Sequence, residues 1–293
     1  MAETTAVPQA IKRIDKVKYS RESSDDFGVE TIVKRSVEHD TVITEQPLQI
    51  TLIWHDADLN IVSKVFAITM RSVGDDECLI LGLLFSEGVI KQPNDIDSIS
   101  LENATEPQNI NSWLVQFNKD IKPNLTSIER FQATYSSCGL CGATSLKALE
   151  LKASADVLSK NIAQQFNVDL VYSLTEKVRK QQALFSLTGG VHSASLFNDA
   201  GQLLGIYEDV GRHNAVDKLI GQGLKHKTLP ANEQLLVMFV SGRVSFEIVQ
   251  KAVMAGISIL VSVGAPSDLA IKAAQRFELT LIGFLKDDSF NLY

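Results

Sequence analysis

Three apolar runs near the C-terminus constrain the fold of this chain more than any other feature of its sequence. They cover residues 234–240, 257–263 and 279–285, and two segments with helical spacing, 244–254 and 267–277, separate them. Strands that are apolar on both faces and alternate with helices are typical of a parallel sheet covered by helices on both sides. The sequence therefore predicts an α/β domain in this part of the chain.

The residues before these runs predict a smaller, β-rich part. Clusters of β-branched residues between Glu30 and Thr69 indicate short antiparallel strands, and a helix with a broad apolar face follows up to Gly88. We divide the chain into an irregular tail (1–28), a β-rich N-terminal domain (29–134), a cysteine-containing loop with a connecting helix (135–157) and the α/β domain (158–293).

Local signals place further elements in the second half. Ser173-Leu-Thr-Glu176 has the pattern of a capping box and predicts a helix that begins there and runs to about Phe185. A strand pair is expected over 188–197 and 203–210. The next helix should begin at 211 and end near Gly221 or Gly223.

The bulk composition is that of a soluble globular protein. The chain has 293 residues, 45% of them hydrophobic, and a net charge of −7, which argues against general binding to nucleic acids or anionic membranes. Three cysteines suit a reducing compartment better than a disulfide framework. Neither a signal peptide nor an apolar run of about 20 residues is visible, so we expect a cytoplasmic protein.

Two of the three cysteines form a C-x-x-C pair, Cys138 and Cys141, within the small and polar stretch 135–145. Glycines and hydroxyl residues around the two thiols leave the sulfur atoms reachable. The third cysteine, Cys78, lies in the first turn of the predicted apolar helix, and we expect it to fill the core there.

Several kinds of chemistry use such a pair. A closed zinc site needs four ligands, and the chain has neither a second C-x-x-C nor an H-x-x-x-H. A zinc deaminase needs H-x-E before P-C-x-x-C, but no histidine is followed by x-Glu, and Ser137 stands where proline is required. A thioredoxin-like dithiol and a thiolate that carries sulfur as a persulfide both remain open, beside an incidental pair.

The segments that follow the three predicted parallel strands are candidates for a ligand site. They are Ser241–Arg243, Gly264–Ser267 and Phe284–Ser289. Ligands bind outside the carboxyl ends of parallel strands, and helix starts there favour anions. Arg243 and Lys286 add positive charge. A phosphate-bearing ligand and ordinary loop chemistry fit this pattern equally well.

Seven segments of the chain resemble, in order, the FdhD/NarQ family of sulfur carriers required for active formate dehydrogenase. They are MRSVGDDE, SSCGLCG, TGGVHSASL, EDVGRHNAVDK, SGRVSFEIVQKAVMAGI, GAPSDLA and LTLIGFLK. The resemblance extends from about residue 30 to the C-terminus. Val73 departs from it, because the family pattern leads us to expect proline there.

The resemblance implies a sulfurtransferase that accepts sulfur from a cysteine desulfurase and passes it to the bis(molybdopterin guanine dinucleotide) molybdenum cofactor, bound as substrate, with no structural metal. It implies Cys138 as the persulfide carrier and Cys141 as its helper. It also implies a cytidine-deaminase-like fold. The implied cofactor-binding residues are Phe284, Leu285, Lys286, Asp287, Asp288 and Ser289.

Other expectations stay open. Formate dehydrogenase is the expected recipient, and a homodimer is conceivable because cytidine-deaminase-like folds often associate. His192, Arg212, His213 and Arg243 have no assigned role, and residues 75–77 are expected to cap a helix. A cofactor-binding chaperone without thiol chemistry and a dithiol oxidoreductase are the alternative functions.

Overall fold

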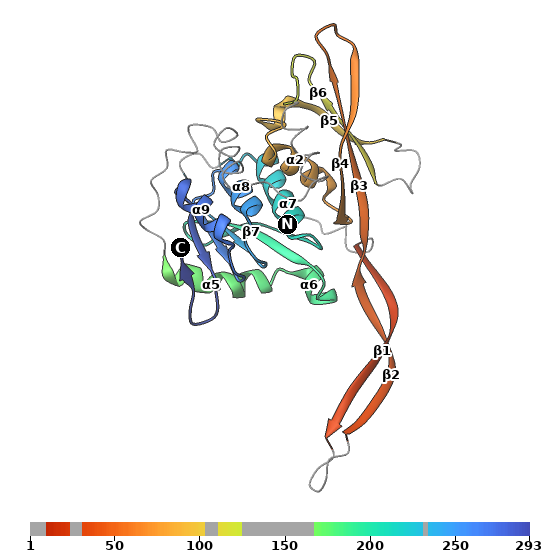
Figure 1. Cartoon of the computed structure of the whole chain (residues 1–293), viewed down its shortest axis with the longest axis vertical. Helices are drawn as coiled ribbons and strands as arrows, with labels where there is room; N and C mark the ends of the chain where they lie inside the picture. The colour runs from red at the N-terminus through yellow and green to blue at the C-terminus, as the bar shows by residue number, and fades with distance from the viewer. Residues whose placement is uncertain (1–9, 24–30, 103–110, 125–166, 231–233) are drawn as a thin grey trace.

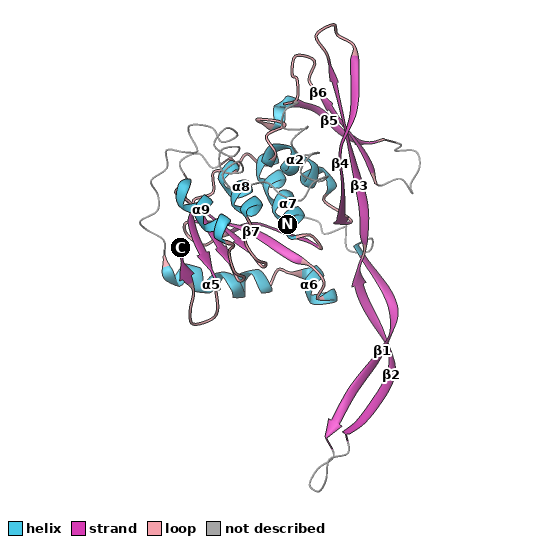
Figure 2. Ribbon diagram, in the orientation of Figure 1, coloured by secondary structure: helices cyan, strands magenta, loops and turns pink. Residues whose placement is uncertain are grey.

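Three β-sheets and the helices around them make up the described part of the chain (Figures 1 and 2). The computed structural model describes residues 10–23, 31–102, 111–124, 167–230 and 234–293. The predicted α/β class with a smaller, β-rich N-terminal part is confirmed. Cys138, Cys141 and the helix predicted to follow them lie outside the described residues.

The largest sheet has six strands and contains the predicted parallel core. Its strand order is β12-β11-β10-β9-β7-β8. The strands are β7 (His192–Asn198), β8 (Leu203–Asp209), β9 (Leu236–Val240), β10 (Ile259–Ser262), β11 (Thr280–Gly283) and β12 (Asn291–Leu292). Strands β9, β10 and β11 are parallel, as their apolar runs predict, whereas β7 pairs antiparallel with both β8 and β9.

Helices cover both faces of this sheet. One face packs against α5 (Val168–Arg179), whose Val171, Leu174 and Val178 join Phe239 and Val261 in one apolar cluster. The other face packs against α7 (Arg212–Lys225), α8 (Phe246–Met254) and α9 (Asp268–Arg276). Alternate residues of β9 and β10 enter the two clusters, which explains why these strands are apolar throughout.

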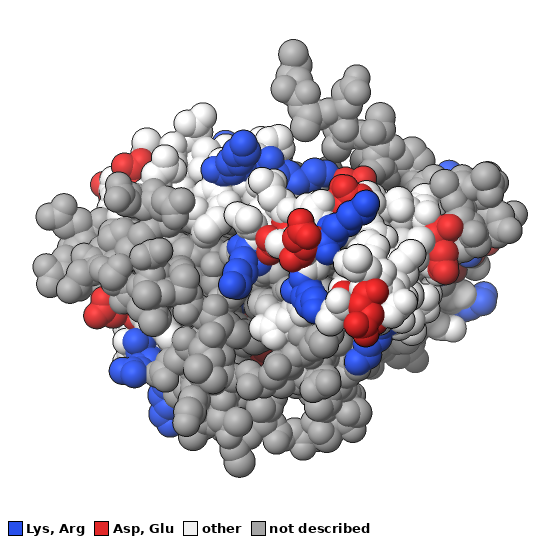
Figure 3. Space-filling view, turned by 90° about the horizontal axis from the view of Figure 1, so that it is seen from above, with Lys and Arg blue, Asp and Glu red and all other residues white. Residues whose placement is uncertain are grey.

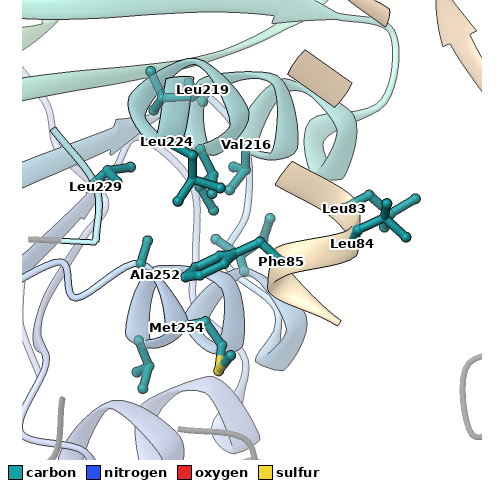
Figure 4. Packing of buried hydrophobic residues seen from close by; sticks show 14 of the residues in the cluster. Leu83, Leu84, Phe85, Val216, Leu219, Leu224, Leu229, Ala252 and Met254 are labelled. Atoms are coloured by element: carbon teal, nitrogen blue, oxygen red, sulfur yellow. The ribbon is translucent and has the colours of Figure 1, made fainter. Parts of the chain in front are cut away.

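The N-terminal part is a four-stranded sheet with order β4-β3-β6-β5, joined to the rest through α2 (Asp76–Ser86). Its strands are β3 (Glu45–His55), β4 (Ile61–Ser72), β5 (Ile96–Leu101) and β6 (Ser112–Phe117), and the short helix η1 (Pro93–Asp95) precedes β5. Ten of the eleven residues of α2 are buried, because α2 lies between this sheet and α7. Phe85 points toward Ala252 of α8, while Leu83 and Leu84 point to the other side of α2 (Figure 4).

Helices α2 and α7 meet backbone to backbone at Gly82 and Gly221. A Cβ on Gly82 would overlap the carbonyl oxygen of Asp217, and one on Gly221 would overlap that of Cys78. The prediction that α7 ends near Gly221 or Gly223 is therefore wrong. The first of these glycines serves helix packing, and the helix continues to Lys225.

Two further predictions need correction. The helix expected to start at the Ser173–Glu176 pattern starts earlier, because Asn167 accepts hydrogen bonds from the amides of Asp169 and Leu170 and caps α5. The hydroxyl of Ser173 instead donates back to Leu170 O at 2.8 Å. Helix α5 ends at Arg179, and a separate short helix, α6, covers Ala183–Thr188.

The third sheet is a ribbon of two long strands, β1 (Ile11–Ser23) and β2 (Thr31–Ile43). They pair antiparallel from Ile11↔Ile43 to Ser23↔Thr31. The ribbon projects from the body of the molecule (Figure 1). Residues 11–23, expected to belong to an irregular tail, are therefore a strand.

Candidate functional site

Five segments meet at the edge of the six-stranded sheet where the parallel strands end. Residues 241–243 follow β9, 263–267 follow β10 and 284–289 follow β11. Because β7 is antiparallel to β9, its first residue, His192, lies at the same edge, as does the start of α7 after β8. We call this set of segments the strand-end site.

The loops after β9 and β10 are tied together by main-chain contacts. Val244 N donates to Ala265 O at 3.1 Å, and Ser267 N donates to Val244 O at 2.9 Å. The buried hydroxyl of Ser262 lies 2.6 Å from Gly242 O and accepts a hydrogen bond from Gly264 N at 3.0 Å. The two loops therefore form one rigid floor for the site.

The side chains of His192 and Arg212 lie beside Gly242, and Arg243 follows it in the chain. A Cβ on Gly242 would lie 3.2 Å from His192 Nδ1 and 3.6 Å from Arg212 Cδ, so glycine permits the close approach of the loop to both side chains. Burial lowers the pKa of His192, and the charges of Arg212 and Arg243 lower it further. Burial and the two nearby arginine charges therefore favour the neutral form of the imidazole.

Arg212 has an unmet donor. Its Nε is buried, and no acceptor for it exists among the residues that the structure describes. A buried donor without a partner costs free energy, so a site with such a donor favours an incoming acceptor. The arrangement of Arg212, Arg243 and the start of α7 fits an oxyanion such as a phosphate group.

Phe284 stands at the end of β11 with a backbone that bulky residues rarely adopt. Its φ is +55°, and its side chain is 41% exposed. The conformation is held by hydrogen bonds from Phe284 N to Gly264 O at 3.1 Å and from Leu285 N to Ser262 O at 3.0 Å. A left-handed backbone at a bulky residue costs free energy, so the surrounding hydrogen bonds must hold it in place.

The other residues of the predicted 284–289 segment differ in how far their side chains are exposed. The side chain of Leu285 is buried in the cluster that contains α5, so only its main chain is available to a ligand. Lys286, Asp287, Asp288 and Ser289 are exposed, and a turn closes with Lys286 N donating to Ser289 O at 2.8 Å.

A buried junction that the sequence did not reveal sets the start of α7. Asp209 accepts hydrogen bonds from Ser72 N at 3.0 Å, Gly211 N at 2.8 Å and Asn214 Nδ2 at 3.1 Å, and it pairs with Lys218 at 2.8 Å. The junction joins two segments of the family resemblance and fixes the residues around Arg212. The position of Ser72, Asp209 and Lys218 within two of the resembling segments was the sequence signal that could have pointed to them.

The other candidate residues, Asp75, Asp76 and Cys78, lie in positions that serve the fold. Arg71 holds Asp76 through two buried hydrogen bonds of 2.8 and 2.9 Å, so this carboxylate is an ion-pair partner as well as a first-turn residue of α2. Asp75 precedes the helix but makes no side-chain capping bond. Cys78 is buried, and burial raises the pKa of its thiol, in agreement with a core position.

Among the described residues, no group of three or more His, Cys, Asp and Glu side chains could hold a metal ion. The helices of the described segments are also too short or too polar to span a membrane.

The fold and the strand-end site define an α/β protein with arginine side chains at the edge where its parallel strands end. A family model described as the FdhD/NarQ family matches residues 43–293. The chain therefore belongs to the FdhD/NarQ family.

Curated relatives match most of the chain. A sulfur carrier protein FdhD from Sulfurisphaera tokodaii is 40% identical over 260 residues, 88% of this chain and 91% of the relative. One of the same name from Streptomyces coelicolor is 41% identical over 265 residues, 88% of each chain. A solved structure, a putative formate dehydrogenase accessory protein from Desulfotalea psychrophila, shares the fold with a TM-score of 0.62 at 24% identity, over 95% of this chain and 96% of that one.

Proposed function

We propose that this chain is a sulfur carrier that takes up sulfur on Cys138 and delivers it to a molybdenum cofactor bound at the strand-end site. The names of the relatives support the sulfur-carrier role and the link to formate dehydrogenase. The unmet donor of Arg212, at the same edge of the sheet as Arg243 and the end of β11, is the observation that carries the ligand assignment. The phosphates and guanine ends of a bis(molybdopterin guanine dinucleotide) cofactor suit cationic and aromatic side chains of this kind.

The chemistry needs two displacement steps. The Cys138 thiolate attacks the outer sulfur of a persulfide on a cysteine desulfurase, the sulfur–sulfur bond of the donor breaks, and the donor thiolate leaves. The Cys141 thiolate then attacks Cys138 Sγ, which releases the carried sulfur as sulfide toward molybdenum. A Cys138–Cys141 disulfide results, and a dithiol reductant restores both thiols.

A mass experiment tests the carrier step. After incubation with a cysteine desulfurase and cysteine, the Cys138 peptide should gain about 32 Da, the mass of one sulfur atom. Cys138→Ala should remove the gain, and Cys141→Ala should retain it and slow its release. Full formate dehydrogenase activity supported by Cys138→Ala would overturn the proposal in favour of a cofactor-binding chaperone without thiol chemistry. Disulfide cycling without a mass gain would favour a dithiol oxidoreductase.

A binding experiment tests the ligand site separately. Calorimetric titration with GDP, a soluble part of the cofactor, should show binding to the wild type and at least about tenfold weaker binding to Arg212→Gln, because a charge-assisted hydrogen bond contributes about 1.5–3 kcal/mol. Lys272→Gln is the matched control, since Lys272 is exposed and pairs with Asp268 on α9. Equal affinities in all three proteins would place the ligand elsewhere.

A further inference from the structure

The β1–β2 ribbon has two faces of different composition. Residues that pair across the ribbon share a face, and successive pairs lie on opposite faces. One face, which we call the arginine face, contains Arg13, Val17, Tyr19, Val33, Arg35 and Val37. The other, which we call the lysine face, contains Lys12, Lys16, Lys18, Glu38 and Asp40.

The lysine face is suited to water. Lys16 pairs with Asp40 at 3.2 Å, and Lys18 lies 3.9 Å from Glu38. Lysine and acidic residues are depleted at protein interfaces relative to the rest of the protein surface. This face therefore gains little from being covered.

The arginine face has charges without partners. Asp15 is the carboxylate on this face, and it lies 2.7 Å from Nδ1 of His39. Among the residues that the structure describes, neither Arg13 nor Arg35 pairs with a carboxylate, and both are exposed. Two such guanidinium groups favour a partner that supplies carboxylates.

Apolar and aromatic side chains accompany these two arginines. Four side chains of the arginine face are 46% to 66% exposed, namely Val17, Tyr19, Val33 and Val37. Arg35 pairs with Tyr19, six positions beyond Arg13 along β1, so the two arginines lie about 20 Å apart along the ribbon. Arginine and tyrosine are enriched at protein interfaces and among the residues that contribute most to binding. The arginine face thus has the composition of a protein interface.

The charge of the ribbon also differs from that of the rest of the chain. The two ribbon strands contain seven Lys and Arg against four Asp and Glu, whereas the whole chain has a net charge of −7. At the end of the molecule away from the ribbon, basic and acidic side chains are interspersed (Figure 3). The ribbon is therefore a basic arm on an acidic protein, and it attracts a partner with an acidic surface.

The base of the ribbon lies beside the strand-end site. Helix α6 packs against β2, and a Cβ on Gly190 would lie 3.5 Å from Cγ2 of Ile43, the last residue of β2. Gly190 is two positions before His192, which belongs to the strand-end site. From this base the ribbon projects outward, with 13 residues in each strand, for about 40 Å (Figure 1). A protein that binds along the ribbon is therefore held next to the strand-end site.

The valines distinguish between two kinds of acidic partner. A nucleic acid offers phosphates to the arginines but leaves Val17, Val33 and Val37 uncovered, and the carboxylates of the lysine face repel it. A protein surface supplies carboxylates and apolar side chains together. The composition of the arginine face therefore favours a protein.

From these observations we infer that the arginine face binds an acidic surface of the enzyme that receives the cofactor, and that the ribbon holds this enzyme beside the strand-end site. The inference rests on the proposed function, because a recipient exists only if the strand-end site carries a cofactor. The recipient, rather than the sulfur donor, is the partner because it must reach the ligand at this site.

Calorimetric titration of the full chain with a purified formate dehydrogenase that lacks its cofactor tests the docking. The wild type should bind this apoenzyme, and Arg13→Glu and Arg35→Glu should each weaken the binding at least about tenfold, because attraction to carboxylates becomes repulsion. Lys12→Glu is the matched control, since it makes the same change of charge at the position next to Arg13 but on the lysine face. Its affinity should stay within about twofold of the wild type.

The same variants separate this inference from the proposed function. Arg35→Glu should bind GDP and gain sulfur mass like the wild type, since Arg35 lies on the ribbon and not in the strand-end site. If these two properties hold but Arg13→Glu and Arg35→Glu bind the apoenzyme as the wild type does, the inference is wrong and the proposed function stands. Absence of apoenzyme binding by the wild type also overturns the inference.

Two other occupants of the arginine face are tested in parallel. Sedimentation equilibrium of Arg35→Glu reports on a second copy of the chain, and titration with a short single-stranded RNA reports on a nucleic acid. A change in self-association or a loss of RNA binding, with apoenzyme binding unchanged, would assign the arginine face to that occupant and overturn the inference.

Discussion

Phe284 combines a strained backbone with a ring that faces solvent. A left-handed conformation costs a residue with a Cβ about 1–2 kcal/mol, and Phe284 retains it with φ at +55°. Hydrogen bonds to Gly264 O and, through Leu285, to Ser262 O hold the segment in place. The ring is thereby kept partly exposed at the end of β11, beside the strand-end site.

Two substitutions at Phe284 separate the contribution of the ring to binding from the cost of the strained backbone to stability. Phe284→Gly should be at least as stable as Phe284→Ala, because glycine adopts positive φ without a clash. Both should bind GDP about tenfold more weakly than the wild type, since stacking on a base contributes about 1–3 kcal/mol. Urea unfolding and calorimetry give the two quantities. Undiminished GDP binding in both variants would show that the ring does not contact the base.

His213 should make the stability depend on pH. Burial, with the charges of Lys251 and Arg212, lowers its pKa to about 4, whereas an unfolded histidine titrates near 6.5. As the pH falls from 6.5 toward 4, the unfolded chain binds a proton that the folded chain resists. The free energy of unfolding should therefore fall by at most about 3 kcal/mol.

The comparison with His213→Gln isolates this effect, because both proteins keep Asp217, whose carboxylate binds Lys251. Urea unfolding at several pH values between 4.5 and 7 should show the stability of the wild type falling relative to that of the variant as the pH falls. A difference independent of pH contradicts the assignment.

At the scale of elements, the crossing of α2 and α7 joins the two large sheets. Gly82 and Gly221 let the two backbones touch, and α7 then carries Arg212 at its first position. Any side chain at the crossing must push the helices apart, so the position of Arg212 depends on these two glycines.

Gly82→Ala tests the crossing. We expect a loss of about 3 kcal/mol in the free energy of unfolding, because overpacking against backbone outweighs the roughly 1 kcal/mol that alanine gains in a helix. Gly190→Ala is the control, since its Cβ would meet Ile43 at an ordinary 3.5 Å. Its stability should change by less than about 1 kcal/mol. Equal stability losses in the two variants would rule out a special role for the crossing.

Elements buried on both faces could be predicted from the sequence, and elements that depend on distant contacts could not. Strands β9, β10 and β11 are apolar throughout because both faces meet helices. Strand β1 alternates charged residues with few apolar ones, since neither face is buried in the body, and so it resembled a tail. In α7, Gly221 looked like a helix stop, although it serves the contact with α2.

The strand-end site was predicted in part for the same reason. The loops after β9, β10 and β11 follow from the parallel order, which placed Arg243 and residues 284–289 at one edge. The proximity of His192 to Arg212 depends on the antiparallel pairing of β7 with β9, and no local pattern encodes that pairing. The roles of Cys138 and Cys141 remain predictions.

At the scale of the whole molecule, the ribbon is separate from the core. Neither of the two apolar clusters contains a residue of 11–43, and the match to the family model begins at residue 43. Strand β3 keeps its pairing with β4 and β6 without the ribbon.

A chain that lacks residues 1–43 should therefore unfold in one transition, with a melting temperature within a few degrees of that of the full chain. Calorimetry measures both properties. A large loss of stability in the truncated chain would show that the ribbon supports the core.

The buried junction at Asp209 also bears on how the protein is made. Asp209 and Lys218 contact Ser72 across 137 and 146 positions of the chain, and α2, buried along almost its whole length, takes partners from α7 and α8. A ribosome releases the N-terminal half first, so α2 leaves the exit tunnel with its apolar surface uncovered and waits for about half of the chain to be translated. The nascent chain is exposed to aggregation during that interval, and slower translation beyond residue 90 would prolong it.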